Sequence, residues 1–404
     1  MPLAFITGRT PALSRLEIEA AATTLPFQWS LLMVHPDVCL LKSTNEADEK
    51  ESLEKYYQSN EIQKLQARLG GTQKIARLDK HVKQDQLVEA LLAELATSDG
   101  TERLTFGLSI YGRGVSALKL GLTLKKHIKK QGRSVRFVTP VGGEILSSAQ
   151  IVGNKLTETD GMELLAVWDN GWHVGHTLTV QDINSYNKRD IGIPVPDPVS
   201  GMLSPKLAQI MINLGLEGKE ATVYDPFCGN GRIVEEARLM GLEAFGSDIL
   251  QSQVDASHKN LAWIATEYEL KVPNEVFFQY DATKPGAAER LQKMIGEGPW
   301  HIVSEPYLGK PLRAPLTQAE QGPWLKELVD LYLAFLKTWA GAPYKPDSML
   351  LVFPAAQCQD GSWLSLFSEV VDRLAGFGYS AVQVSDYGRP DAHVRRELVR
   401  IDFK

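Results

Sequence analysis

The second half of the chain alternates short apolar runs with amphipathic stretches, which is the pattern of an α/β fold. A β-rich run ends at Asp225, further strands are predicted at residues 243–247, 276–280 and 300–304, and helices are predicted at 232–241 and 251–268. Polar residues stand where these strands end. We therefore expect a largely parallel sheet that gathers polar side chains at the carboxyl ends of its strands.

The first half alternates helix and strand less regularly, which predicts an α+β arrangement. The expected elements are strands 3–7 and 38–41, helix 13–22, a charged helical segment from Glu46, helix 84–96, strand 103–109, helix 117–131, strand 134–138 and helix 146–154. Strands 163–168 and 174–180 should form a hairpin, because Asp169-Asn170-Gly171 between alternating apolar flanks is a strong hairpin signal.

Residues 182–203 have the composition of a linker, since prolines and glycines are frequent from Gly192 to Gly201. A helix start follows, because Ser204 suits an N-cap, Pro205 suits the first helical position, and apolar residues then recur at helical spacing. These signals predict four segments, which are residues 1–60, 61–181, the linker 182–203 and 204–404.

With 404 residues, 44% hydrophobic and 23% charged, the chain has the composition of a globular protein of two or three domains. It lacks the features of a signal peptide, and no run approaches the roughly 18 apolar residues of a membrane span. Its three cysteines, Cys39, Cys228 and Cys358, are too far apart for a disulfide framework or a zinc site. We therefore expect a cytoplasmic protein without a membrane segment or a bound metal.

The net charge of −6 argues against a nucleic-acid partner, but the distribution of charge along the chain is more informative. Residues 103–143 carry nine Lys or Arg and no Asp or Glu. Local positive charge provides affinity for phosphates, so this segment predicts a nucleic-acid contact. A solvated helix face is the alternative. The candidate RNA-binding residues are Lys125, Lys126, Lys129, Lys130, Arg133 and Arg136.

Asp225-Pro-Phe-Cys-Gly229-Asn-Gly231 has the composition of a nucleotide-binding turn between a strand and a helix. Glycines let the backbone turn tightly and approach a ligand closely. Asp248 follows Asp225 by 23 residues, near the spacing of a ribose-binding carboxylate. Val234 stands where a dinucleotide fingerprint has its third glycine, which disfavours NAD. The turn instead resembles the first motif of S-adenosylmethionine-dependent methyltransferases.

Ser304-Glu305-Pro306-Tyr307 follows the strand at 300–304 and resembles the catalytic turn of amino-methyltransferases, which act on exocyclic nitrogens of nucleobases. A base amine is a weak nucleophile because its lone pair is delocalised into the ring. A polar side chain and a backbone carbonyl can accept its two N–H bonds and direct the lone pair toward the methyl group. An aromatic residue gives the extruded base a stacking surface.

The chain as a whole resembles the THUMP-domain-containing tRNA guanosine-10 N2-methyltransferases, in the family's order and over nearly its full length. The likeness is carried by residues 106–112, 120–126, 132–137, 146–150, 154–156, 180–186, 189–190 and, most specifically, 201–214 leading into the turn 225–231.

This resemblance implies an N-terminal ferredoxin-like domain and a THUMP domain that hold tRNA, followed by a class I methyltransferase domain. That domain would have a seven-stranded sheet whose last strand, 394–403, is antiparallel. The cofactor would be S-adenosylmethionine, and a small activator subunit is left open as a further partner. The implied cofactor residues are Asp225, Phe227, Cys228, Gly229, Asn230, Gly231, Asp248, Ile249, Asp281 and Ala282, with Asp281 near the adenine amino group.

One departure from the family affects the catalytic turn. The family usually has Asp-Pro-Pro-Tyr there, whereas this chain has Glu305 in place of the first proline. Either Ser304 accepts the amine, or the register shifts and Glu305 supplies a carboxylate. The expected function is methylation of a guanine N2 amine in tRNA. The alternatives are a methyltransferase for another base amine, in rRNA or DNA, and an RNA-binding protein without turnover.

Overall fold

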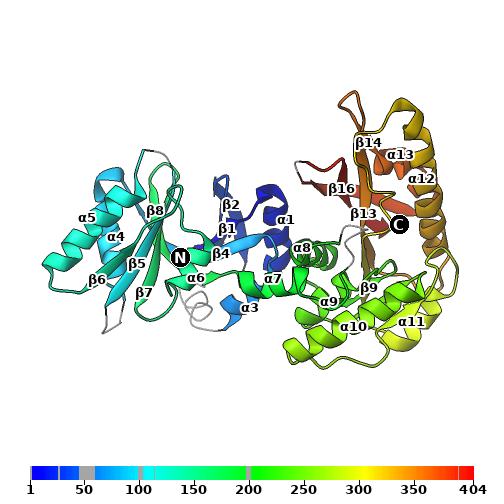
Figure 1. The fold of residues 1–404 in the computed structure, drawn as a ribbon, viewed down its shortest axis with the longest axis horizontal. Helices are drawn as coiled ribbons and strands as arrows, with labels where there is room; N and C mark the ends of the chain where they lie inside the picture. Colours follow the sequence, from blue (N-terminus) through cyan, green and yellow to red (C-terminus); the bar gives the residue numbers. More distant parts are fainter. Residues whose placement is uncertain are drawn as a thin grey trace. The chain divides into compact units, whose positions relative to one another are not determined.

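The computed structural model describes residues 2–25, 28–44, 60–98, 103–112, 114–196, 202–389 and 391–404. The chain forms two compact units, Met1–Asn184 and Ser185–Lys404 (Figure 1). The expected helix from Glu46 lies outside the described residues. No described helix has the length and apolar character that crossing a membrane would require.

The C-terminal unit is built on one mixed sheet in the order β11-β10-β9-β12-β13-β16-β15. Its last strand along the chain, β16, is antiparallel to both of its neighbours, as expected, whereas β9 to β13 run parallel. A short strand, β14, pairs with β13 outside this path. The strands are β9 Thr222–Asp225, β10 Ala244–Asp248, β11 Phe277–Gln279, β12 Trp300–Ser304, β13 Ser348–Gln357, β14 Trp363–Ser365, β15 Tyr379–Tyr387 and β16 Val394–Phe403.

Side chains along the buried strands of this sheet alternate between its two faces, and both sets are mostly apolar. Helices therefore cover both faces of the sheet. On β12, Ile302 belongs to the aromatic-rich core formed with α12 and α13. The next residue, Val303, faces α8 so closely that a Cβ on Gly215 would lie 2.7 Å from its methyl group. The helices are α7 Ile183–Ile191, α8 Pro205–Leu216, α9 Arg232–Leu239, α10 Gln251–Glu267, α11 Ala287–Ile295, α12 Gln318–Ala340 and α13 Leu366–Leu374.

The described residues of the N-terminal unit form an eight-stranded sheet in the order β2-β3-β1-β4-β8-β7-β5-β6. Its strands are β1 Leu3–Thr7, β2 Trp29–His35, β3 Val38–Ser43, β4 Thr72–Val82, β5 Leu104–Tyr111, β6 Val135–Val138, β7 Gly161–Trp168 and β8 Trp172–Val180. Its helices are α1 Pro11–Ala22, α3 Glu61–Arg68, α4 Leu87–Leu95, α5 Ala117–Lys130 and α6 Ser148–Gly153.

The predicted α/β class is confirmed, as are the hairpin of β7 and β8 and the N-cap at Ser204, whose hydroxyl accepts from the Leu207 amide. Two features differ from the expected organisation. Helix α7 occupies part of the predicted linker, and β4 pairs with both β1 and β8, so the sheet runs through both predicted N-terminal segments. The four domain ranges, with the ferredoxin-like and THUMP assignments, stay predictions.

Candidate active site

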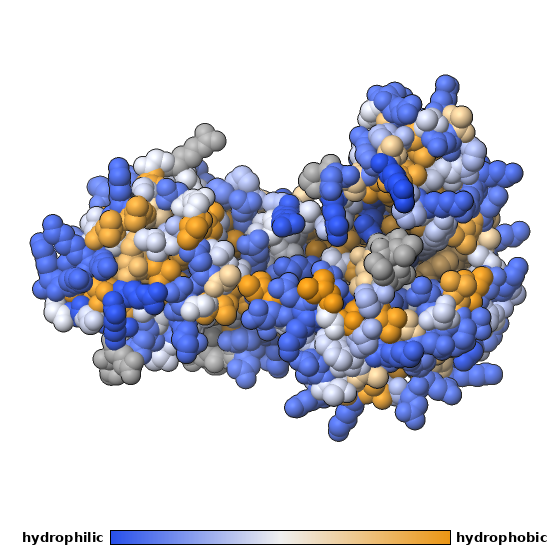
Figure 2. Space-filling view, in the orientation of Figure 1, coloured by the Kyte–Doolittle hydropathy of each residue, from blue (hydrophilic) through white to orange (hydrophobic). Residues whose placement is uncertain are grey.

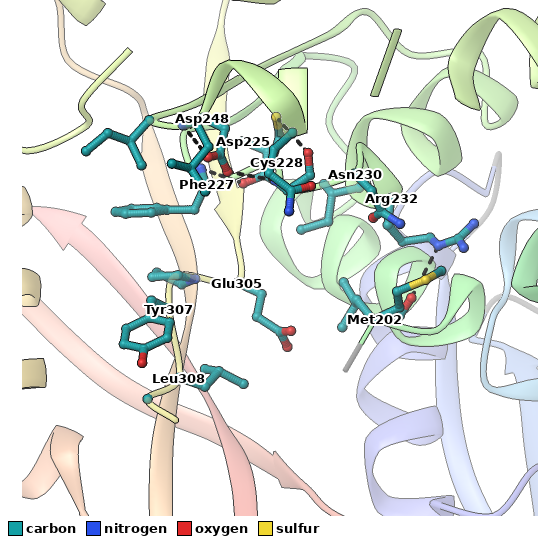
Figure 3. A pocket seen from close by; sticks show the side chains of 18 of the residues that line it. Met202, Asp225, Phe227, Cys228, Asn230, Arg232, Asp248, Glu305, Tyr307 and Leu308 are labelled. Atoms are coloured by element: carbon teal, nitrogen blue, oxygen red, sulfur yellow. Dashed lines mark hydrogen bonds between the residues drawn. The ribbon is translucent and has the colours of Figure 1, made fainter. Parts of the chain in front are cut away.

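A pocket of about 510 Å³ lies where β9, β10 and β12 end (Figure 3). The glycine turn after β9 forms one wall, and the turn after β12 forms the opposite wall. Residues that follow β10 and the segment before α8 complete it. Segments far apart in the sequence meet here because the carboxyl ends of parallel strands share one edge of the sheet.

The glycine turn has a shape that requires its two glycines. Gly229 has φ +51° and Gly231, the N-cap of α9, has φ +98°, a backbone region that other residues rarely adopt. A Cβ on Gly231 would also lie 3.1 Å from the Cβ of Ser257. Helix α10 holds the turn in place, because its Ser257 and Asn260 side chains donate hydrogen bonds to the carbonyls of Gly229 and Asn230, respectively. The backbone of this wall is therefore held in place by side chains of α10.

Asp248 ends β10 and reaches back to the glycine turn. Its carboxylate oxygens accept the amides of Gly229, at 3.0 Å, and Leu250, at 2.9 Å. Burial raises its pKa, and these amide donors oppose the rise. A carboxylate can accept about four hydrogen bonds, so both oxygens keep capacity for hydroxyl donors of a ligand.

Asp225 ends β9 and is 3% exposed. Its Oδ1 accepts from the Phe227 amide at 3.1 Å and from the Ser304 hydroxyl at 2.5 Å. Burial raises the pKa of Asp225 to about 7, against the opposing effect of these donors, and the nearby carboxylates of Asp248 and Glu305 add to the rise. Asp225 thus links the two walls of the pocket through Ser304.

Two donors in the pocket wall lack a partner among the described residues. They are Nδ2 of Asn230 and one terminal nitrogen, Nη2, of Arg232, and both are buried. The other nitrogens of Arg232 donate to the Leu203 carbonyl and to Glu235. Buried polar groups without a partner are rare in folded proteins, so these two donors fit a bound anionic or carbonyl group.

The turn after β12 presents its residues unequally to the pocket. Glu305, Pro306 and Tyr307 line it, and Tyr307 is 43% exposed. Ser304, by contrast, is fully buried and its hydroxyl is directed to Asp225. The Glu305 side chain extends into the pocket on the side that faces Met202 (Figure 3). Arg396 of β16 donates to both Glu305 oxygens, at 2.5 and 3.2 Å.

The structure brings most predicted cofactor residues together and leaves two apart. Asp225, Phe227, Cys228, Gly229, Asn230, Asp248 and Ile249 line the pocket, and Gly231 caps the helix beside it. Asp281 and Ala282 are not among the described residues that line it, and Asp281 instead accepts from the amide and hydroxyl of Thr283. Ile249 and its neighbour Leu250 are more than half exposed, although both are apolar.

The predicted RNA-binding residues lie in the N-terminal unit, on α5, in the turn that follows it (Arg133) and on β6 (Arg136). Four of them are exposed, namely Lys126, Lys129, Lys130 and Arg136. In the described part of the chain, these three lysines and Lys125 form no ion pair. Figure 2 shows hydrophilic side chains on this unit at the left of the view. Arg133 donates to Ser98 and Arg136 to Asn154, so these two arginines are partly held by the fold.

Sequence reasoning missed Arg232, Arg396 and Met202. Arg232 had a signal, because a basic residue at the start of a helix opposes the helix dipole and suggests a local reason. Arg396 had none, since it is 91 residues from Glu305 and only the pairing of β16 with β13 brings it near. Met202 lies in the predicted linker, where nothing indicated a ligand contact.

Parts of this chain are similar to known proteins. Residues 196–279 match the family described as RMKL-like, methyltransferase domain, a range that includes the glycine turn and Asp248. Curated proteins named tRNA (guanine(10)-N2)-dimethyltransferase are 33% identical over 103 residues in Methanothermobacter thermautotrophicus and 30% identical over 130 residues in Methanocaldococcus jannaschii. These matches cover 25% and 31% of this chain and 29% and 35% of the relatives, so the chain spans about a third of their length. The crystal structure of TrmN from Thermus thermophilus matches all of this chain and 99% of its own, with a TM-score of 0.52 and 16% identity.

The strand order, the antiparallel β16 and the pocket at the strand ends define the C-terminal unit as a class I methyltransferase domain. Its residues 196–279 match the RMKL-like methyltransferase domain family, and parts of the chain are similar to proteins named tRNA (guanine(10)-N2)-dimethyltransferase.

Proposed function

We propose that this chain is a cytoplasmic S-adenosylmethionine-dependent methyltransferase that methylates the exocyclic N2 amine of a guanosine in tRNA, with position 10 as the first candidate. The observation that carries the proposal is the pocket in which a methyltransferase glycine turn faces the turn Ser304–Tyr307. The substrate follows from the relatives, which are named for guanine-10 N2 of tRNA.

The pocket offers a suitable group for each part of the cofactor. Asp248 can accept the ribose hydroxyls, and the exposed apolar side chains of Ile249 and Leu250 can cover the adenine ring. The unpartnered donors of Asn230 and Arg232 suit the carboxylate of the methionine part. When bound, S-adenosylmethionine supplies a methyl group that is activated by a positively charged sulfur.

The opposite wall suits a flat base. Tyr307 follows a proline at the end of a strand and exposes its ring to the pocket, where it can stack on a base drawn out of the RNA. The Tyr332 hydroxyl shares its one proton between the Val352 carbonyl, at 2.9 Å, and the Tyr307 carbonyl, at 3.3 Å, which ties the turn to β13. Residues of this turn would thus position the amine. The tRNA itself is expected on the basic face of α5.

The proposal is tested with purified protein, labelled S-adenosylmethionine and unmodified tRNA transcripts, followed by mass spectrometry of the nucleosides. We expect labelled N2-methylguanosine or N2,N2-dimethylguanosine, mapped to position 10. A transcript with inosine at position 10 is the matched control, because inosine lacks only the N2 amine, and it should remain unlabelled. Label on adenosine, or equal label on the inosine transcript, would contradict the proposal.

A second candidate, an RNA-binding protein without turnover, is favoured by two observations. The Ser304 hydroxyl is directed away from the pocket to Asp225, and Glu305 replaces a proline of the family's turn. The same assay separates the two, since this candidate binds tRNA but leaves every nucleoside unlabelled.

A further inference from the structure

The turn after β12 holds a carboxylate where the related turn has a proline, and the structure shows how this carboxylate is placed. Glu305 lines the pocket, and its side chain is 15% exposed. Its neighbour Ser304, the residue that would accept the amine in the usual register, has no exposed surface. The group available to a base in this pocket is therefore the Glu305 side chain.

Ser304 is committed to another task. Its hydroxyl proton is donated to Oδ1 of Asp225, at 2.5 Å, so the hydroxyl joins the end of β12 to the end of β9. A base amine could use this oxygen as an acceptor only if the strand end opened. The buried location and the hydrogen bond together give Ser304 a structural role.

Three carboxylates line the pocket, and two of them are bound by backbone amides. Asp225 accepts from the amide of Phe227, and Asp248 accepts from the amides of Gly229 and Leu250. These bonds hold both carboxylates at the wall formed by the glycine turn, where the cofactor is proposed to bind. Glu305 belongs instead to the wall that carries Tyr307. It is thus the carboxylate placed beside the proposed base-stacking ring.

Arg396 fixes the plane of the Glu305 carboxylate. Strand β16 brings it there, since Arg396 lies opposite Pro354 of β13, the strand next to β12. Its guanidinium donates to both Glu305 oxygens, in the two-point geometry that orients a carboxylate most firmly. Two of the roughly four acceptor positions of the carboxylate are used in this way, and about two remain for a ligand.

We infer that the Glu305 carboxylate, oriented by Arg396, accepts the N–H of the target amine and receives its proton during methyl transfer. Glu305 is then a catalytic residue, Arg396 a positioning residue, and Ser304 a support for Asp225. The inference rests on the proposed function, and it assigns to the second residue of the turn the work that the related motif gives to the first.

The chemistry balances with groups already named. The amine nitrogen forms a bond to the methyl carbon while the carbon–sulfur bond breaks, and that electron pair remains on the sulfur, which becomes neutral. The nitrogen is then positively charged and strongly acidic, so an ion-paired carboxylate is basic enough to take its proton. Glu305 later releases the proton to water.

The first test uses binding, without turnover. S-Adenosylmethionine carries a positive sulfur and S-adenosylhomocysteine a neutral one, so a carboxylate that faces the reacting atoms should favour the former. Calorimetry on Glu305→Gln should show S-adenosylmethionine weakened by roughly tenfold relative to S-adenosylhomocysteine. Glu369→Gln, which removes an exposed carboxylate on α13, is the matched control and should leave this ratio unchanged.

The second test uses turnover on tRNA. Glu305→Gln should lower kcat by about 10²- to 10³-fold with little change in the KM for tRNA, the scale of a lost proton acceptor. Ser304→Ala should cost far less. Arg396→Gln should lower kcat while the KM for tRNA is kept, and Arg396→Lys should restore part of the loss, because a lysine can still bind one carboxylate oxygen.

The outcomes separate the two proposals. Methylation by the wild type that Glu305→Gln leaves unchanged, together with an unchanged affinity ratio, would overturn the role of Glu305 alone. A larger loss in Ser304→Ala than in Glu305→Gln would do the same and return the role to Ser304. Absence of methylation by the wild type on every tRNA offered would overturn the proposed function and the role of Glu305 with it. Unchanged affinity for S-adenosylhomocysteine confirms that each variant is folded.

Discussion

Asp248 illustrates how a single side chain can hold a turn and keep acceptor capacity for a ligand. Its oxygens accept the amides of Gly229 and Leu250. If the remaining capacity binds ribose hydroxyls, Asp248→Ala should weaken S-adenosylmethionine binding by roughly 1.5–3 kcal/mol, the scale of hydrogen bonds to charged groups. Calorimetry measures this directly. Asp248→Asn, which keeps the shape and one acceptor, should lose less, and unchanged affinity in a folded Asp248→Ala would remove this residue from the site.

Asp225 makes the stability of the C-terminal unit depend on pH. Burial raises its folded pKa from 3.8 to about 7, so between these values the folded state holds a proton that the unfolded chain has lost. Its contribution to the free energy of unfolding is therefore complete below about pH 4 and falls as the pH rises. Above about pH 7 the contribution is lost, and the total loss is up to about 4 kcal/mol.

Asp225→Asn tests this dependence, since asparagine can still accept from Ser304 and Phe227 but does not ionise. We expect the free energy of unfolding of the wild type, relative to the variant, to decrease between about pH 4 and 7 in urea titrations. Glu235, whose pKa burial also raises to about 7, is present in both proteins and cancels in the comparison. A constant difference across this range would show that Asp225 is ionised throughout.

At the scale of residues, the sequence predicts those parts of the site that depend on neighbours in the chain. Gly229, Gly231 and Asp248 follow from local turn chemistry and spacing. The direction of the Ser304 hydroxyl does not, because it depends on Asp225, which is 79 residues away. The ion pair of Glu305 with Arg396 is equally invisible until the sheet order is known.

Among the elements, α5 concentrates the positive charge of the N-terminal unit. Lys125, Lys126, Lys129 and Lys130 lie in its last turns, and the described residues offer them no acidic partner. Reversing all four to Glu should weaken tRNA binding and flatten its salt dependence, by roughly 0.7–0.9 in the logarithmic slope for each lost phosphate contact. Filter binding or fluorescence anisotropy over a range of salt concentrations measures both effects.

The matched control for α5 reverses four exposed lysines of the C-terminal unit, Lys259, Lys271, Lys293 and Lys326. Both variants change the net charge equally, so a difference in slope reports location and not total charge. Binding of S-adenosylhomocysteine should survive in each. If the α5 variant keeps the wild-type slope, the lysines form only a solvated helix face.

Elements with a local signal were predicted well, and those without one were missed. The helix after Ser204 begins as its cap indicates. Strand β13 was missed, and it contains Pro354, a residue that argues against a central strand because it cannot donate to the sheet. Strand β4 was also missed. It contains Lys74, which is 1% exposed and paired with the buried Glu163, and a lysine in the sequence does not indicate a buried strand position.

At the scale of the molecule, the strand order of each sheet lay beyond sequence patterns and entered through the family resemblance. The resemblance implied the antiparallel last strand correctly. The linker, however, was placed where α7 lies. From Ser185 onward, helix α7 belongs to the C-terminal unit. Arg189 donates to the buried Glu236 at 2.7 Å, and Tyr186 donates to Gln209 at 2.5 Å.

These contacts predict where the chain can be divided. A fragment of residues 183–404 keeps α7, whereas one of residues 193–404 leaves Glu236 buried without Arg189. Breaking a buried ion pair by removing one partner costs about 3–5 kcal/mol, so the shorter fragment should be less stable by about this amount. Urea unfolding of both fragments checks it, and equal stabilities would show that α7 is only a connector.

The longer fragment also tests how the two units share the work. We expect residues 183–404 to bind S-adenosylhomocysteine with nearly the affinity of the full chain, because every described residue that lines the pocket lies in it. Residues 1–182 should bind tRNA with the salt dependence assigned to α5. Mixed in solution, the fragments should methylate tRNA far more slowly than the intact chain, since the covalent connection supplies the effective concentration that holds RNA near the pocket. Full activity of residues 183–404 alone would show that the methyltransferase unit selects its tRNA unaided, and would remove α5 from substrate binding.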